Sequence, residues 1–107
     1  MTCAEVFARM GEKFQEFRLK DVHGIFQFHV RGPGGGQWHA ICRGDHCQVK
    51  SGVHQRPDVT ITASADTVVR LAEGRMRPTQ ALLTRKVKVK GDLLLIAKMK
   101  VLLSPWA

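Results

Sequence analysis

The chain has 107 residues, of which 44% are hydrophobic, and its 17 Lys and Arg against 9 Asp and Glu give a net charge of +8. A chain of this length folds as one domain and buries about two-thirds of its extended surface, so it can build a core without disulfides or metals. No apolar run reaches the roughly 20 residues of a membrane-spanning helix, and the N-terminus lacks the apolar block of a secretory signal. We therefore expect a single intracellular domain over residues 1–107, cytoplasmic in the simplest case.

The positive charge is concentrated in the second part of the chain, where residues 66–107 hold nine Lys and Arg against three Asp and Glu. Such a segment favours anionic partners, including the headgroups of anionic membranes. The three cysteines are an odd number and too few for a disulfide scaffold. Reduced thiols are therefore the default expectation.

The first predicted element is an amphipathic helix over residues 3–17. Thr2 and Glu5 have the spacing of a capping box, in which the hydroxyl and the carboxylate satisfy free amides of the first turn. Apolar side chains then recur at helical spacing, at Val6, Phe7, Met10, Phe14 and Phe17.

Alternation of apolar and polar residues predicts four strands, over residues 22–30, 37–43, 46–50 and 58–64. In the first strand, Phe26 and Phe28 share one face, and Trp38 lies on one face of the second. The glycine cluster 32–36 joins these two strands as a hairpin connection. It lacks the Lys and Ser/Thr of a phosphate-binding loop, so we do not assign it that role.

The next predicted elements are two short helices and a fifth strand. Ser64 fits the N-cap of a helix that ends at Gly74, and Pro78 fits the first turn of another. The segment 86–91 reads KVKVKG and predicts a strand whose lysines lie on the wet face. Lysines in such positions discourage edge-to-edge pairing.

The last predicted helix is apolar on nearly all sides, since only Lys98 and Lys100 interrupt the run from Leu93 to Leu103. Three interpretations remain open: a buried core helix, a docking surface for a partner, or one wall of a cavity for an apolar ligand. The large side chains of Phe26, Phe28 and Trp38, which point into the same interior, favour the third.

Several functional classes are disfavoured. No residues resemble a nucleophile elbow or a cysteine-protease signature, so we expect no catalysis and no cofactor. The five histidines lack the helical spacing of metal ligands, and we predict no metal site. The strands lack the aromatic and glycine signature of RNA-recognition modules, which argues against nucleic acid as a partner.

The stretch CRGDHC, residues 42–47, predicts a tight turn at Gly44-Asp45 that places Cys42 opposite Cys47. Directly opposite residues at a non-hydrogen-bonded position lie about 4.5 Å apart at Cα, close enough for a cross-strand disulfide. Two alternatives remain for this pair, a disulfide or two free thiols, and a reducing compartment favours the thiols.

The order of these elements resembles the sterol carrier protein 2 (SCP2) domain family along nearly the whole chain. The similar residues are the strand pair around Trp38, the strand 57–62 and the segment 71–92. The last segment carries the patterns L-x-x-G-x-x-x-P and K-h-K-h-x-G-[ND], where h is apolar, which are typical of the family.

The resemblance implies an α+β fold in which a five-stranded, mixed and largely antiparallel sheet carries helices on one face and encloses a hydrophobic tunnel. It also implies binding, and intracellular transfer, of fatty acids, acyl-CoA, sterols or phospholipids without catalysis. The lipid chain would supply the cover that the terminal helix needs.

The resemblance further implies which side chains line the tunnel, and Arg18 or Lys20 would bind a lipid headgroup at its mouth. The chain ends Ser104-Pro105-Trp106-Ala107 rather than in a peroxisomal tripeptide. The tunnel mouth is either open or covered by a second copy in a homodimer. The implied wall residues are Phe26, Phe28, Trp38, Leu71, Leu82, Leu83, Val89, Leu94, Ile96, Met99 and Leu102.

Two functions remain open on this basis. The first is a stand-alone lipid-binding and lipid-transfer protein that makes transient contact with anionic membranes. The second is an accessory protein that presents a lipid-like substrate, for example a quinone precursor, to an enzyme complex.

Overall fold

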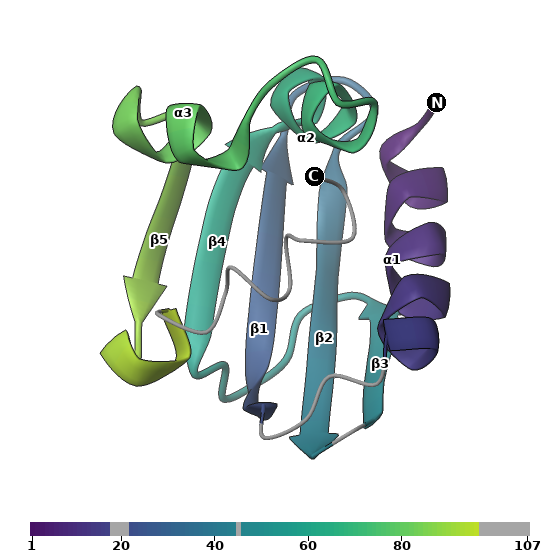
Figure 1. Cartoon of the computed structure of the whole chain (residues 1–107), viewed down its shortest axis with the longest axis vertical. Helices are drawn as coiled ribbons and strands as arrows, with labels where there is room; N and C mark the ends of the chain where they lie inside the picture. Colours follow the sequence, from purple (N-terminus) through teal and green to yellow (C-terminus); the bar gives the residue numbers. More distant parts are fainter. Residues whose placement is uncertain (18–21, 45, 97–107) are drawn as a thin grey trace.

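The strands form one mixed sheet in the order β3-β2-β1-β4-β5, which confirms the predicted α+β fold with a five-stranded mixed sheet (Figure 1). The enclosed tunnel stays a prediction. The computed structural model describes residues 1–17, 22–44 and 46–96. In chain order the elements are α1 (Cys3–Phe17), β1 (Val22–Arg31), β2 (Gly36–Gly44), β3 (His46–Ser51), β4 (Val59–Ser64), α2 (Ala65–Ala72), α3 (Pro78–Leu83) and β5 (Val87–Gly91).

All neighbouring strands are antiparallel except β1 and β4, which pair in parallel. Phe28 at the centre of β1 lies opposite Trp38 of β2 and Ile61 of β4. Because successive side chains point to opposite faces, this register collects most apolar strand residues on one face, called here the inner face, while Ile25 and Ile41 pair on the other face. β5 is an edge strand, and Lys88 and Lys90 are exposed on it as predicted.

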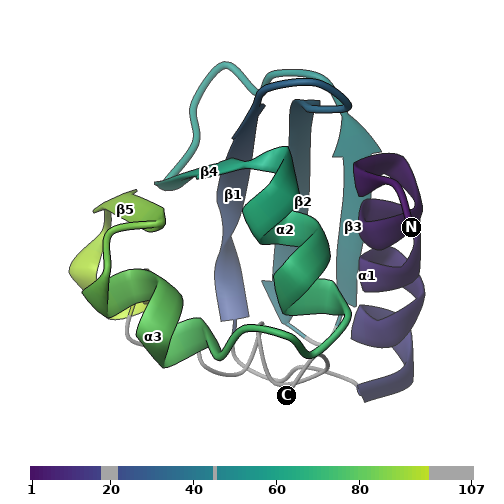
Figure 2. The same ribbon diagram turned by 90° about the horizontal axis from the view of Figure 1, so that it is seen from above.

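The helices lie on the inner face, as Figure 2 shows. On α1, the Phe7 ring stacks on Trp38 with centroids 4.5 Å apart and meets the edge of Phe28 at 5.0 Å. The Cys3 thiol donates to the carbonyl of Ala65 at the start of α2, at 3.7 Å. The Thr2 hydroxyl accepts from the amide of Glu5 at 3.2 Å, which confirms the predicted cap.

The helices α2 and α3 end with the same backbone arrangement. After α2, Gly74 has φ of +74° and the Arg75 amide donates to the Arg70 carbonyl at 2.9 Å. After α3, Arg85 has φ of +59° and the Lys86 amide donates to the Ala81 carbonyl at 2.9 Å. The sequence predicts the left-handed residue at Gly74 but not at Arg85, because glycine is the usual residue there.

The predicted terminal helix begins within the described residues, as a helical turn over residues 93–96. The Asp92 carboxylate caps it by accepting from the amides of Leu94 at 2.9 Å and Leu95 at 3.3 Å. Leu95 packs on β1 over Gly24, where a Cβ atom would lie only 2.5 Å from a Leu95 methyl carbon. The remainder of that helix lies outside the described residues.

Candidate functional site

The inner face carries the hydrophobic core cluster of the described residues. Phe26 of β1 is fully buried, whereas Phe28 and Trp38 are only partly buried against the same cluster. Val89 of β5 and Ile96 of the terminal turn also pack on this cluster and are also partly buried. The structure therefore brings these five predicted wall residues together.

Residues from two helices join this surface without having been predicted to line it. Phe7 of α1 covers Phe28 and Trp38 through its ring. Val68 and Val69 of α2 pack against the cluster, whereas the predicted Leu71 is half-buried. The helical spacing of Phe7 indicated an inward side chain, but only the tertiary packing shows that it meets the two strand aromatics.

Three predicted wall residues lie instead on the surface. The exposed fractions are 43% for Leu82, 85% for Leu83 and 77% for Leu94. On α3 the inward position belongs to Ala81, and on the terminal turn it belongs to Leu95. A run of leucines has no polar residue to set its phase, so the sequence alone does not identify the one that faces the sheet.

Four predicted site residues lie outside the described residues. They are the headgroup candidates Arg18 and Lys20, and Met99 and Leu102 of the terminal helix. Their roles stay predictions.

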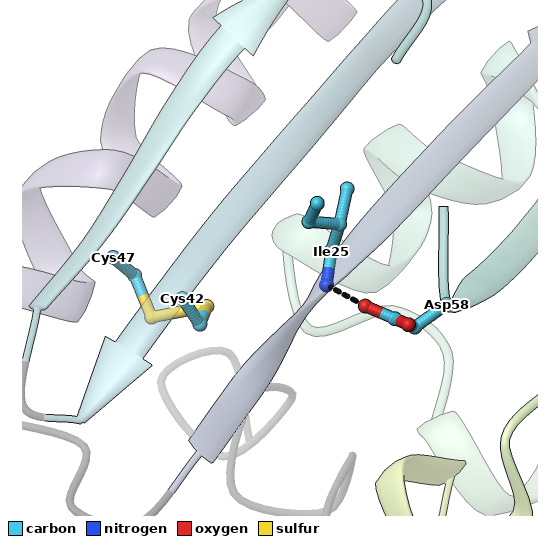
Figure 3. The surroundings of a disulfide bond; sticks show 4 residues. All are labelled: Ile25, Cys42, Cys47 and Asp58. Atoms are coloured by element: carbon cyan, nitrogen blue, oxygen red, sulfur yellow. Dashed lines mark hydrogen bonds between the residues drawn. A yellow bond between two sulfur atoms is a disulfide. The ribbon is translucent and has the colours of Figure 1, made fainter. Parts of the chain in front are cut away.

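A hollow of about 380 Å³ lies where β1 begins and β2 ends, near the point at which residues 18–21 enter β1. His23 and Arg43 line it from directly opposite positions on these strands. The Asp58 carboxylate also lines it and accepts from the Ile25 amide at 2.8 Å (Figure 3). Ile25 and Ile41 line it as well, so the hollow lies on the face of the sheet opposite to the inner face and has a mixed apolar and charged lining.

Cys42 and Cys47 are joined by a disulfide, drawn in Figure 3. They face one another across β2 and β3 with Cα atoms 4.1 Å apart, in the predicted register. Of the two alternatives left open for this pair, the structure contains the disulfide and not two reduced thiols. Cys3 is a free, buried thiol, and burial raises its pKa, so it stays protonated and unreactive at neutral pH.

The part of the chain that the structure describes contains neither a metal-binding cluster nor a membrane-spanning helix. No cluster of three or more His, Cys, Asp or Glu side chains there is arranged to hold a metal ion. No helix in the same part of the chain has both the length and the apolar character needed to span a bilayer.

Comparison with known proteins gives one family. A family described as the SCP-2 sterol transfer family matches residues 6–104. A curated relative, hydroxysteroid dehydrogenase-like protein 2 of Xenopus laevis, is 29% identical over 100 residues, which are 92% of this chain and 24% of the relative. The chain thus spans about a quarter of the length of that relative.

Solved structures share the fold. Palmitated SCP2L2 from Aedes aegypti is 24% identical and superimposes with a TM-score of 0.82 over 95% of each chain. The ubiquinone synthesis protein UbiJ-SCP2 is 14% identical and superimposes with a TM-score of 0.69 over 97% of each chain.

Proposed function

Because the chain belongs to the SCP-2 sterol transfer family, we propose that it binds the apolar chain of a lipid on the inner face of its sheet and transfers that lipid without catalysis. The observation that carries this proposal is the continuous apolar surface from β3 to β5, whose central aromatics Phe28 and Trp38 are incompletely buried. A lipid chain that lies against them would complete their burial. We take residues 1–107 as one such binding domain.

The wall that we propose consists of residues that face the inner cluster. The half-buried Leu71, together with Met99 and Leu102, stays a predicted member. The exposed Leu82, Leu83 and Leu94 are not part of it, because a side chain in solvent does not touch a lipid held inside. The proposed wall is Phe7, Phe26, Phe28, Trp38, Val89 and Ile96.

The physical basis of affinity is the burial of methylene groups. Each buried methylene contributes about 0.8 kcal/mol, so a long acyl chain can bind tightly with few polar contacts. Selectivity should then be loose among fatty acids, acyl-CoA, sterols and phospholipids. The palmitate carried by the structural neighbour from Aedes aegypti supports a fatty acid as the first ligand to test.

A lipid carboxylate would meet basic side chains at the mouth of the site. Arg18 and Lys20 are the candidates from the sequence. We expect Lys20→Ala to weaken binding of palmitate but not of the uncharged alcohol with the same chain. The matched control is Arg43→Ala, because the register places Arg43 on the face of the sheet opposite to the inner face. An equal effect on acid and alcohol would contradict the headgroup role.

Displacement of a fluorescent fatty acid tests the wall directly. Val89 and Lys88 are neighbours on β5, with Val89 facing the inner cluster and Lys88 facing solvent. Val89→Ser should lower palmitate affinity by about tenfold, since it removes apolar contact area, while Lys88→Ser should leave it unchanged. Equal affinities for the two variants would exclude this face of β5 from the site.

A second function is supported by the likeness to the ubiquinone synthesis protein, which covers 97% of each chain. In this role the domain would present a lipid-like substrate, such as a quinone precursor, to an enzyme complex. A pull-down beside a vesicle transfer assay separates the two functions. Stable capture of an enzyme without transfer activity supports the accessory role, and transfer without a partner supports the carrier role. A homodimer covering the tunnel mouth stays a prediction.

A further inference from the structure

The surface of α3 exposes apolar side chains beside basic ones. Ala81 is fully buried and attaches the helix to the fold, while Leu83 is 85% exposed and Leu82 is 43% exposed. Single exposed leucines are common on protein surfaces, so exposure alone identifies no function. Whether these two leucines belong to a binding surface depends on the residues around them.

The surrounding charge has one sign. Residues 74–91 contain six Lys and Arg and no Asp or Glu. Arg77 before α3 and Arg85 and Lys86 after it are exposed. Within the described residues the ion pairs join Asp66 to Arg70 and Glu73 to Arg75, so these three basic side chains have no carboxylate partner there.

The backbone at Arg85 supplies an independent observation. Arg85 is the one non-glycine residue with positive φ in the part of the chain that the structure describes. The equivalent position after α2 is Gly74, which adopts this conformation without steric cost, whereas an arginine there is strained. The conformation costs backbone energy that glycine would avoid, which makes Arg85 the position at which a role of the side chain is tested first.

The position of α3 suits contact with a flat surface. Figures 1 and 2 both show it at one end of the edge strand β5, on the side of the molecule opposite α1. The helix α3 thus lies at a corner of the fold rather than over the middle of the sheet.

We propose that Arg77, Leu82, Leu83, Arg85 and Lys86, called here the docking corner, bind the surface of an anionic lipid bilayer. The leucines enter the boundary between headgroups and acyl chains, and the three cations meet the anionic headgroups. This inference goes beyond the proposed function, since it concerns where the empty protein meets a membrane and not which lipid it holds. It also gives a role to two leucines that the inner face does not use.

Vesicle co-sedimentation of the full chain without added ligand tests the docking corner, with phosphatidylcholine vesicles compared with mixed phosphatidylcholine and phosphatidylserine vesicles. Arg85→Gly should weaken binding to the anionic vesicles about fivefold, because one cation near an anionic membrane contributes about that factor. The same change relieves the backbone strain, so its urea midpoint should stay equal or rise. Loss of binding in a protein that is at least as stable supports a direct role of the guanidinium.

Matched controls lie elsewhere on the surface. Val53 is a 61% exposed apolar residue and Arg56 an exposed cation, and both lie in the loop between β3 and β4, which Gln27 attaches to the face of the sheet that the helices leave open. Leu83→Ser should weaken vesicle binding about tenfold, whereas Val53→Ser and Arg56→Gly should not change it.

Unchanged vesicle binding of both Arg85→Gly and Leu83→Ser would overturn the proposal, and so would an equal loss of vesicle binding in Arg56→Gly. A loss of palmitate affinity in Leu83→Ser with intact vesicle binding would also overturn it and return Leu83 to the wall. Palmitate binding by Arg85→Gly in solution, without vesicles, tests the proposed lipid-binding function separately. That function can be wrong even if the docking corner binds membranes.

Discussion

Gln27 shows how one polar side chain organises the face of the sheet that the helices leave open. It is 1% exposed, and its amide nitrogen donates to the carbonyls of Trp38 at 3.0 Å and Gly52 at 3.2 Å. Its amide oxygen accepts from the His54 amide at 2.8 Å. Gln27 thus attaches the first part of the loop after β3 to β1, and Asp58 attaches the end of the same loop to Ile25.

Replacement of Gln27 by leucine, which has nearly the same volume, should lower the free energy of unfolding by about 2 kcal/mol. The cost arises because the part-buried carbonyls of Trp38 and Gly52 and the amide of His54 lose their hydrogen bonds to Gln27. Urea unfolding measures it, with Gln48→Leu at an exposed position of β3 as the control. A cost no larger than that of the control would show that this network does not hold the loop.

Cys3 gives the fold a pH dependence at alkaline pH. Burial raises the pKa of its thiol above the ordinary value of 9.0, so the folded state holds the proton more tightly than the unfolded state. This contribution to stability is fully present below about pH 9 and is lost as the pH rises through the folded pKa. Unfolding curves measured at pH values below and above 9 should therefore show that the free energy of unfolding falls more steeply with pH in the native protein than in Cys3→Ala. Parallel losses would contradict this assignment.

At the scale of elements, the β2–β3 hairpin is held by its disulfide as well as by its ladder. The bond closes a loop of only a few residues, so the chain-entropy estimate of its contribution is about 2 kcal/mol. Reductant should lower the free energy of unfolding by up to this amount in the native protein. It should have no effect on Cys42→Ser/Cys47→Ser, which serves as the control. An unchanged native protein would show that the pair is already reduced in solution.

At the scale of the whole molecule, the strands and helices were predictable because local signals agreed with tertiary packing. Strict alternation, as in VTITAS and KVKVK, sets both the strand and its buried face. Ser64 and Gly74 mark the ends of α2 by their own chemistry. The candidate site was harder to predict, because an apolar run such as Leu93–Ile96 has no polar residues that mark which side chain faces the sheet. Only the packing of Leu95 over Gly24 in the folded protein identifies that side chain.

The central claim is that a lipid chain lies against the inner face, and Trp38 is its natural reporter. The chain has two tryptophans, so Trp106→Phe leaves the fluorescence of Trp38 alone. Because Trp38 is stacked on Phe7 and only partly buried, a ligand that covers it should change the intensity and wavelength of its emission. Titration of this variant with palmitate should give a saturable change that Val89→Ser shifts to higher concentration. An emission that palmitate leaves unchanged, together with no displacement of a fluorescent fatty acid, would contradict the account.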